Sequence, residues 1–184
     1  MREPKALAPA RIKWALELLR IEKDSNIFEI GCGSGIAAQR ICPLLGRGSY
    51  MGVDRSPAAI KASLARNAAY AKAGRAIFVE GAFNARDREP ALFDRIFAVN
   101  VNAFWAGDGA EILDVRRLMH AKSLFVQVYE PPDTEQRTKI AHILKRRMAA
   151  YFGDVTTTKR TIGGAALLAL IATGAPPQRL ARSD

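Results

Sequence analysis

Short apolar segments of strand length alternate along the chain with segments in which apolar residues recur every three or four positions. The first pattern is typical of buried strands and the second of amphipathic helices. The expected strands are residues 26–30, 49–53, 76–79, 93–99, 123–129, 155–161 and 165–171. The expected helices are residues 9–20, 36–45, 59–73 and 110–119, and a longer one after Pro131-Pro132 that runs to about residue 151.

This alternation predicts a doubly wound α/β fold. Parallel neighbouring strands need crossover connections, and helices in those connections cover both faces of the sheet. Gly163-Gly164 separates the last two segments, which predicts a C-terminal hairpin and an antiparallel strand at one edge. We therefore expect a mostly parallel, seven-stranded sheet in a single domain spanning residues 1–184. Residues 1–25 would form an N-terminal helix and lid, and residues 175–184 a loose tail.

Composition narrows the class of protein. The 184 residues are 49% apolar and 25% charged, which is enough for one core and excludes wholesale disorder. Two cysteines, Cys32 and Cys42, fit a reducing compartment better than a disulfide scaffold. The N-terminal residues lack the apolar run of a signal peptide, and the weakly polar stretch 163–175 is too short to span a bilayer. The sequence thus predicts a cytoplasmic protein without a membrane partner.

The net charge of +10 leaves a nucleic-acid partner open without favouring one. Lysines and arginines number 28 against 18 acidic residues, but they are spread along the whole chain, and the densest group is residues 145–147. Domains dedicated to nucleic acids usually gather their charge on one arm or face and interleave aromatic residues. We interpret the charge as a generally basic surface.

A glycine turn and an acid mark a nucleoside site. The first expected strand runs into Gly31, Gly33 and Gly35, and glycines at alternate positions allow a tight turn and close approach of a ligand. The second strand ends at Asp54, where a carboxylate can accept hydrogen bonds from both ribose hydroxyls. Residues 33–38 formally satisfy the looser dinucleotide motif, but that frame begins two residues beyond the glycine that ends the strand.

A second interpretation places all three glycines behind the acid Glu29. In that register, residues 29–35 resemble the first motif of the class I S-adenosylmethionine-dependent methyltransferases. Residues 52–56 and 93–100 are similar to the second-strand and fourth-strand motifs of that family, and residues 79–83 lie where its members approach the adenine, so the resemblance runs from Asn26 to about Trp105. It implies the seven-stranded fold, S-adenosyl-L-methionine as the cofactor and methyl transfer as the reaction.

The resemblance also implies roles for the first two motifs. Glu29 would lie near the methionine amino group and stiffen the glycine turn. Gly31, Gly33 and Gly35 would pass beneath the methionine and the ribose, and Asp54 would bind the ribose hydroxyls.

The resemblance also implies roles for residues that follow the second, third and fourth expected strands. Arg55 would lie along one face of the adenine, and Asn100 would help to hold the methionine amino group. Many family members carry an aspartate that accepts a hydrogen bond from the adenine amino group where this chain has Ala82. Here the backbone of Ala82 and Phe83, or the nearby Asn84, would have to read the adenine edge.

Residues that follow the fourth and fifth strands should line the acceptor site. Asn102, Trp105 and Tyr129 are the candidates, since amide and aromatic side chains beyond strand ends suit a flat acceptor. Methyl transfer depends mainly on positioning, so no catalytic base is assigned, and His120 and His142 are not favoured for that role. No Cys/His cluster has zinc spacing, so no metal is expected.

Three functions follow. The first is a methyltransferase acting on a small-molecule acceptor, since no charged arm is present to grip a macromolecule. The second is a methyltransferase of RNA or of a ribosomal protein, which the net charge motivates. The third is a non-catalytic nucleoside-binding module, which the missing adenine-reading acid motivates.

Overall fold

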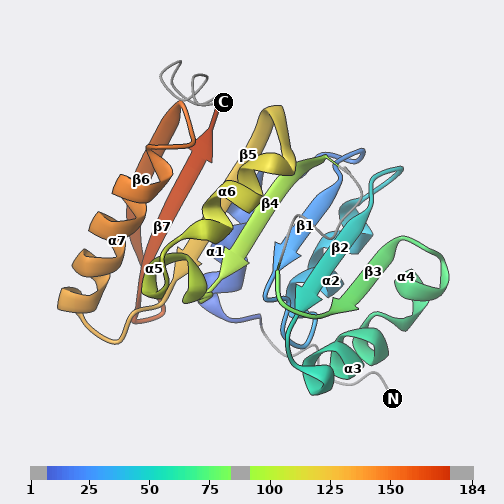
Figure 1. The fold of residues 1–184 in the computed structure, drawn as a ribbon. Coiled ribbons are helices and arrows are strands. Elements are labelled where there is room, and N and C mark those ends of the chain that lie inside the picture. Colours follow the sequence, from blue (N-terminus) through green and yellow to red (C-terminus); the bar gives the residue numbers. More distant parts are fainter. Residues whose placement is uncertain (1–7, 84–91, 175–184) are drawn as a thin grey trace.

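The computed structural model describes residues 8–83 and 92–174, which form one seven-stranded sheet (Figure 1). The strand order is β3-β2-β1-β4-β5-β7-β6. Neighbouring strands from β3 to β5 are parallel, and β7 is antiparallel to both β5 and β6. The strands are β1 (Ile27–Ile30), β2 (Tyr50–Asp54), β3 (Ala76–Glu80), β4 (Phe93–Val99), β5 (Met119–Tyr129), β6 (Asp154–Ile162) and β7 (Ala165–Thr173).

Helices cover both faces of this sheet. They are α1 (Ala10–Leu19), α2 (Ile36–Ile41), the 3-10 helix η1 (Cys42–Leu44), α3 (Pro57–Arg66), α4 (Ala68–Lys72), α5 (Ala103–Ala106), α6 (Ala110–Arg117) and α7 (Thr134–Met148). Apolar residues of α5, α6 and α7 pack with one face of the sheet, and those of α1 and α2 pack with the other. The expected doubly wound fold with a C-terminal hairpin is confirmed.

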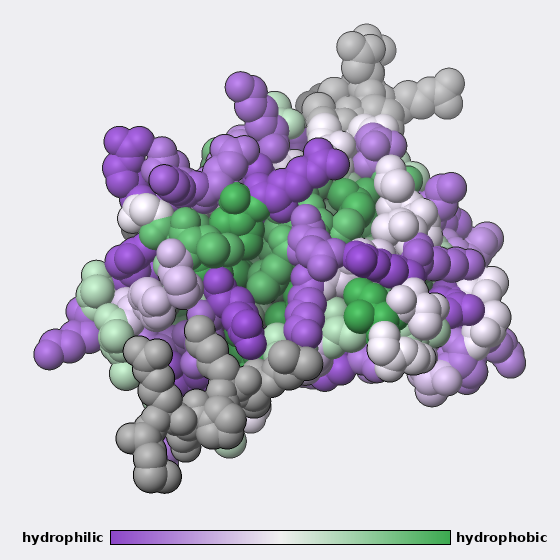
Figure 2. Space-filling view, turned by 180° about the vertical axis from the view of Figure 1, so that it is seen from behind, coloured by the Kyte–Doolittle hydropathy of each residue, from purple (hydrophilic) through white to green (hydrophobic). Residues whose placement is uncertain are grey.

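Burial on both faces explains why the central strands are mostly apolar, whereas the edge strand β6 is mostly polar. In β1, Phe28 and Ile30 face the core beneath α5 to α7, whereas Ile27 faces the core beneath α1 and α2. Strands that are buried on both sides cannot alternate polar and apolar residues. The face turned away in Figure 1 shows apolar side chains in its centre, surrounded by hydrophilic ones (Figure 2).

Two expected helices are broken in the structure. The segment expected as one helix from residue 59 to 73 divides into α3 and α4 at Asn67, whose backbone is not helical. The Asn67 side chain donates to the carbonyl oxygens of Ser63, four residues before it, and of Gly35, in the turn after β1, and these bonds compete with a continuous helix. The segment expected from residue 36 to 45 is α2 followed by η1, with Pro43 in the first turn of the latter.

β5 begins four residues before the expected position. His120 therefore lies in a strand, where the sequence predicted a helix end and a surface turn. The His120 Nε2 atom lies 2.9 Å from Oδ1 of Asp94, and the Ser123 hydroxyl donates to the Phe93 carbonyl oxygen at 2.7 Å. These bonds hold the start of β5 against β4 across a register shift.

The N-terminal helix is part of the core. Trp14, Ala15 and Leu19 of α1 are buried against the sheet, and near its start Arg11 forms an ion pair with Glu130 at 2.6 Å. The expected lid over the site concerns residues 1–25, of which 1–7 lie outside the described ranges, as do the tail 175–184 and Asn84. In the described ranges, no helix has the length and apolar character needed to cross a membrane.

Candidate functional site

The turn after β1 is built from three glycines in the left-handed region. Gly31, Gly33 and Gly35 have φ angles of 74°, 52° and 72°. A Cβ on Gly31 would lie 2.7 Å from Cγ2 of Val101, and one on Gly35 would lie 2.6 Å from Nδ2 of Asn67. A Cβ on Gly33 would meet no atom within 4 Å. Gly31 and Gly35 are thus required by packing, whereas Gly33 faces open space.

Polar residues at the end of α3 hold the carbonyl oxygens of this turn. The Ser63 hydroxyl donates to the Gly33 oxygen at 2.7 Å. Nε of Arg66 donates to the Ser34 oxygen, and Nδ2 of Asn67 donates to the Gly35 oxygen, each at 3.1 Å. None of these three residues was predicted as a site residue from the sequence. Their spacing of three and four positions, which places them on one helix face, was the available signal.

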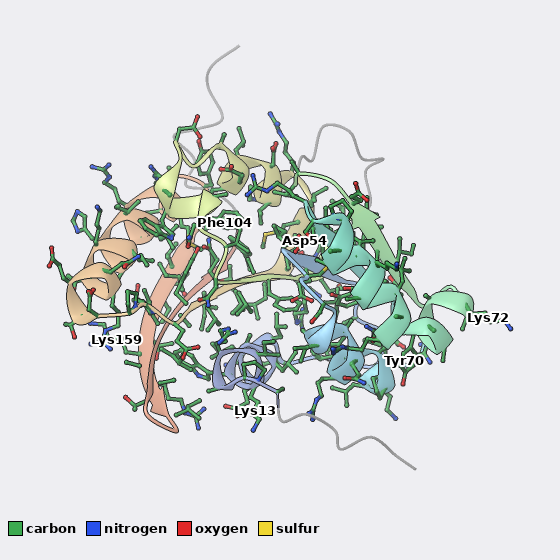
Figure 3. The ribbon with its side chains drawn as sticks, turned by 90° about the horizontal axis from the view of Figure 1, so that it is seen from below. Lys13, Asp54, Tyr70, Lys72, Phe104 and Lys159 are labelled. Carbon is green, nitrogen blue, oxygen red and sulfur yellow. The ribbon has the colours of Figure 1, made fainter. Side chains whose placement is uncertain are left out.

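Asp54 lies at the carboxyl end of β2, with its carboxylate fixed by the backbone. Oδ2 accepts from the Gly33 N–H at 2.8 Å and Oδ1 accepts from the Ser56 N–H at 3.0 Å. Each carboxylate oxygen keeps a further lone pair. Asp54 and Phe104 both lie near the centre of the end of the sheet that Figure 3 shows, whereas Lys13, Lys72 and Lys159 lie on the outside.

Glu29 lies beneath the turn and does not line the cavity described below. It is buried, and the hydroxyl of Tyr50 donates to its Oε2 atom. Burial raises the pKa of Glu29 to about 8; the Tyr50 hydrogen bond opposes this shift, and the negative charge of Asp54 adds to it. In the structure Glu29 is therefore a buried carboxyl group paired with a core tyrosine, and its expected roles near the methionine amino group and in stiffening the turn stay predictions.

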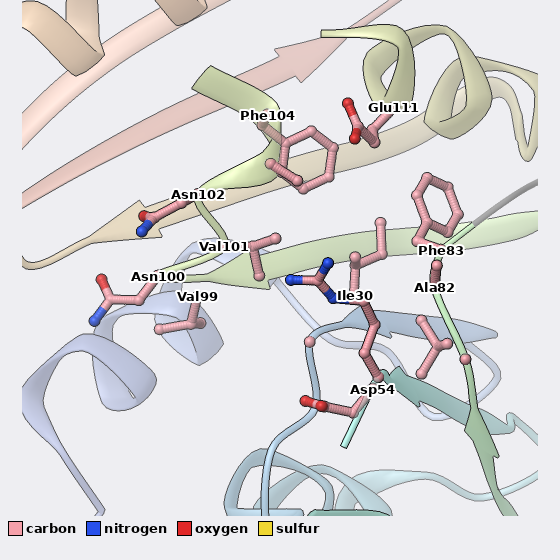
Figure 4. Close-up of a pocket in the computed structure, with 15 residues that line it drawn as sticks. Ile30, Asp54, Ala82, Phe83, Val99, Asn100, Val101, Asn102, Phe104 and Glu111 are labelled. Atoms are coloured by element: carbon pink, nitrogen blue, oxygen red, sulfur yellow. The ribbon is translucent and has the colours of Figure 1, made fainter. Parts of the chain in front are cut away.

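A cavity of about 390 Å³ opens at the carboxyl ends of β1, β2 and β4, and we call it the main cavity (Figure 4). It brings together seven of the predicted residues, namely Gly31, Asp54, Arg55, Ala82, Phe83, Asn100 and Asn102. Glu111 and Phe104 complete its wall from α6 and α5. Glu29, Gly33, Gly35, Trp105 and Tyr129 are not among its lining residues.

Asn100 connects the ends of β4 and β5. Its φ angle of 56° is one that asparagine tolerates better than most residues. Its side-chain oxygen accepts from the Glu130 N–H at 2.8 Å, and its own N–H donates to the Val128 oxygen at 2.9 Å. A left-handed residue at this point turns the chain sharply out of β4.

A second hollow of about 210 Å³ lies over the end of β5, and we call it the β5 hollow. It shares Asn100 and Asn102 with the main cavity and adds Tyr129, Glu130, Pro131, Pro132, Gln136 and Ile140. Tyr129 is buried, and its hydroxyl oxygen lies 2.9 Å from the Val101 oxygen. Trp105 lines neither hollow; its indole N–H donates to Oδ1 of Asn102 at 3.2 Å.

Arg147, in the densest group of basic residues, is an exception to the generally basic surface that the sequence predicts. Its guanidinium donates to the carbonyl oxygens of Phe104 and Gly107 at 2.9 and 2.6 Å, and thereby holds the end of α5. Lys145 and Arg146 are exposed, as expected. Arg147 is instead a support of the main cavity wall.

The histidines lie away from the main cavity. His120 is near the start of β5, at the opposite end of the sheet, and His142 is exposed on α7. Within residues 8–83 and 92–174, no three His, Cys, Asp or Glu side chains gather as metal ligands would.

A family model described as a methyltransferase domain matches residues 28–122, just over half of the chain. No curated protein matches significantly. Among solved structures, the chain is similar to a precorrin-6y C5,15-methyltransferase from Geobacter metallireducens GS-15, with a TM-score of 0.66, 19% identity and coverage of 95% of this chain and 94% of that chain. An S-adenosylmethionine-dependent O-methyltransferase from Thermotoga maritima gives a TM-score of 0.69 at 13% identity, with coverages of 97% and 70%.

A third similar structure is an S-adenosylmethionine-dependent methyltransferase from Thiobacillus denitrificans in complex with S-adenosyl-L-homocysteine. Its TM-score is 0.57 at 18% identity, with coverage of 82% of this chain and 67% of that chain. At these identities the similar structures establish the fold alone. The match of the family model to just over half of the chain establishes the family. The chain belongs to the class I S-adenosylmethionine-dependent methyltransferases, the family whose motifs its glycine turn and Asp54 resemble.

Proposed function

We propose that the main cavity binds S-adenosylmethionine and that the methyl group of this cofactor passes to a small-molecule acceptor in the β5 hollow. The observation that carries this proposal is the meeting of the glycine turn, Asp54 and Asn100 around one cavity that shares two residues with the β5 hollow. A volume of about 390 Å³ is ordinary for a cofactor site.

The residues of the main cavity fit this cofactor. Asp54 offers free lone pairs to a ribose, and its carboxylate is already oriented by the Gly33 and Ser56 amides. Gly31 lines the main cavity and has no side chain, since a Cβ there would collide with Val101, so the turn presents only backbone atoms to a ligand at this point. Asn100, at the junction with the β5 hollow, would then lie beside the methionine end.

S-adenosylmethionine supplies a methyl group on a positively charged sulfur, which departs as a neutral thioether when a lone pair of the acceptor attacks the methyl carbon. Because this leaving group is already activated, the chain has mainly to position the acceptor and exclude water. Asn100 and Asn102, between the main cavity and the β5 hollow, are placed to orient an acceptor by hydrogen bonds. No described residue is assigned as a general base.

The lining of the β5 hollow supports a small acceptor over a nucleic acid. Its residues include amides, a carboxylate, prolines and a tyrosine, but no lysine or arginine to bind a phosphate. Of the basic residues 145–147 on α7, Arg147 is used by carbonyl oxygens, which leaves Lys145 and Arg146 as exposed and screened charges.

Titration calorimetry with S-adenosylmethionine and S-adenosylhomocysteine tests the cofactor assignment. Asp54→Ala removes the acceptor of two ribose hydroxyls, at a cost of about 1–3 kcal/mol, so affinity should fall about tenfold or more. Asp24→Ala, which removes an exposed carboxylate paired with Arg47, is the matched control and should bind normally. Equal affinity of the two variants would remove the ribose assignment.

A panel of acceptors at low and moderate salt tests the acceptor class. We expect turnover on a small molecule to change little with salt, because phosphate contacts alone would give a steep dependence. Methylation of RNA or of a ribosomal protein that falls steeply with salt would replace the small-molecule proposal. NAD at millimolar concentration should not displace the cofactor, and clear competition would favour the dinucleotide interpretation of the glycine turn.

A further inference from the structure

Glu111 contributes an unsatisfied carboxylate oxygen to the wall of the main cavity. In the described part of the chain, six buried side-chain nitrogen or oxygen atoms have no hydrogen-bond partner. Only one of them, Oε2 of Glu111, belongs to a residue that lines the main cavity. A buried acceptor without a donor is costly, so its presence at a ligand cavity indicates that the ligand supplies the donor.

The position of Glu111 is fixed by its surroundings. It lies in the first turn of α6, which begins after Gly109 at a φ angle of 88°. Oδ1 of Asp108 accepts from the Ala110 N–H at 2.9 Å and caps this turn. Arg147 holds the preceding loop through the Phe104 and Gly107 carbonyls. The carboxylate is therefore presented by a rigid element.

Glu111 and Asp54 lie at different ends of the main cavity (Figure 4). Asp54 is beside the glycine turn, whereas the Glu111 carboxylate lies near Phe104 and on the side of Phe83. The aromatic rings of Phe83 and Phe104 lie near this carboxylate (Figure 4). Two aromatic rings beside one carboxylate suit a flat ring that carries an amino group at its edge.

We propose that Glu111 accepts a hydrogen bond from the exocyclic amino group of the cofactor's adenine and so selects the base. This inference rests on the proposed function, since it takes the ribose to bind Asp54. The side chain of Ala82 offers no acceptor, and α6 supplies one from another direction. Glu111 is then a residue that determines the specificity for the cofactor.

The chemistry of the purine edge gives a direct test. Adenine presents an amino donor at this position, whereas hypoxanthine presents a carbonyl oxygen, which a carboxylate repels. Glu111→Gln keeps the size of the side chain but adds an amide donor that can serve the carbonyl oxygen. The variant should therefore bind the adenine and hypoxanthine forms more equally.

The experiment compares S-adenosylhomocysteine with S-inosylhomocysteine by titration calorimetry. We expect the unaltered protein to prefer the adenosyl compound by about tenfold or more and Glu111→Gln to reduce this preference to about threefold or less. Asp114→Asn, which removes a carboxylate of α6 paired with Arg117, is the matched control and should keep the full preference.

The outcomes separate this inference from the proposed function. If the unaltered protein binds neither compound, the cofactor assignment fails and the inference fails with it. If it binds S-adenosylhomocysteine and Glu111→Gln keeps the full preference, the role of Glu111 alone is refuted. Should Glu111→Gln fail to fold, Glu111→Ala provides the same comparison, because loss of the carboxylate must also remove the repulsion of the carbonyl oxygen.

Discussion

Alanine at Gly33 and at Gly35 should damage the protein in different ways. Both glycines have left-handed φ angles, of 52° and 72°, and an alanine in this region costs about 1–2 kcal/mol. At position 33 nothing lies within 4 Å of the new methyl group, so this conformational cost is the whole expected loss of stability. At position 35 the methyl group would lie 2.6 Å from Nδ2 of Asn67 and 3.0 Å from Cα of Ser63.

The collision at position 35 requires a shift of Asn67, which donates to the Gly35 oxygen, and of the α3 backbone. Loss of that hydrogen bond adds about 1 kcal/mol, and the backbone shift adds more, so we expect a total of about 3 kcal/mol or more. Urea unfolding followed by circular dichroism measures both variants. Equal losses of stability for the two variants would refute this use of the geometry.

Gly33→Ala, the less destabilised of these two variants, should nevertheless weaken binding of the cofactor. The Gly33 amide bonds directly to Asp54, so a methyl group at position 33 would project close to the proposed ribose. Gly33→Ala should remain folded at 25 °C but lose about tenfold or more in affinity for S-adenosylhomocysteine in titration calorimetry, since 1.4 kcal/mol corresponds to tenfold. Normal affinity in a folded Gly33→Ala protein would contradict the proposed path of the cofactor over the turn.

Three further variants test the supports of the site and of the sheet. Burial raises the pKa of Glu29 from 4.5 to about 8. Its contribution to stability is therefore complete below about pH 4.5 and is lost as the pH rises through 8. Glu29→Gln should reduce the change with pH of the free energy of unfolding in urea between about pH 5 and 9. Burial alone would raise the pKa of Asp94, but hydrogen bonds from the Asn26 N–H and from His120 outweigh burial and lower this pKa. The stability that Asp94 contributes above about pH 4 is therefore lost on acidification. Asp94→Asn should remove this loss when unfolding is followed in an acid titration. Arg147→Gln should lower the free energy of unfolding by about 1–3 kcal/mol and weaken cofactor binding, whereas the exposed Arg146→Gln should do neither.

The fold could be predicted from the sequence because its strands and helices have clear periods and are separated by glycines and prolines. Every expected strand formed, including the C-terminal hairpin around Gly163-Gly164. The break at Asn67 was not predictable, because it depends on a hydrogen bond to Gly35, a residue far away in the sequence. The early start of β5 likewise depends on the contact between His120 and Asp94, across two strands.

The candidate site could be predicted only where its residues form short continuous motifs. Gly31 and Asp54 follow directly from a strand that ends in a recognisable string, and both line the main cavity. Ser63 and Arg147 carry no such signal, since each donates to a carbonyl oxygen brought near by the packing of a helix, and Glu111 lines the main cavity only because α6 packs beside it. A serine or an arginine on an amphipathic helix has the same sequence pattern whether it faces water or a buried carbonyl.

The position of β7 between β5 and β6 has a consequence for synthesis of the chain. Of the described strands, β7 is made after all the others, yet it is the strand that pairs with β5. Until residue 173 has left the ribosome, the β5 edge, with buried residues such as Val126 and Val128, has no neighbour on that side. An open apolar edge is a template for pairing with other chains, and non-local strand pairing is slow. The nascent protein should therefore be especially prone to aggregation, and in need of a chaperone, after β5 has emerged and before β7 emerges.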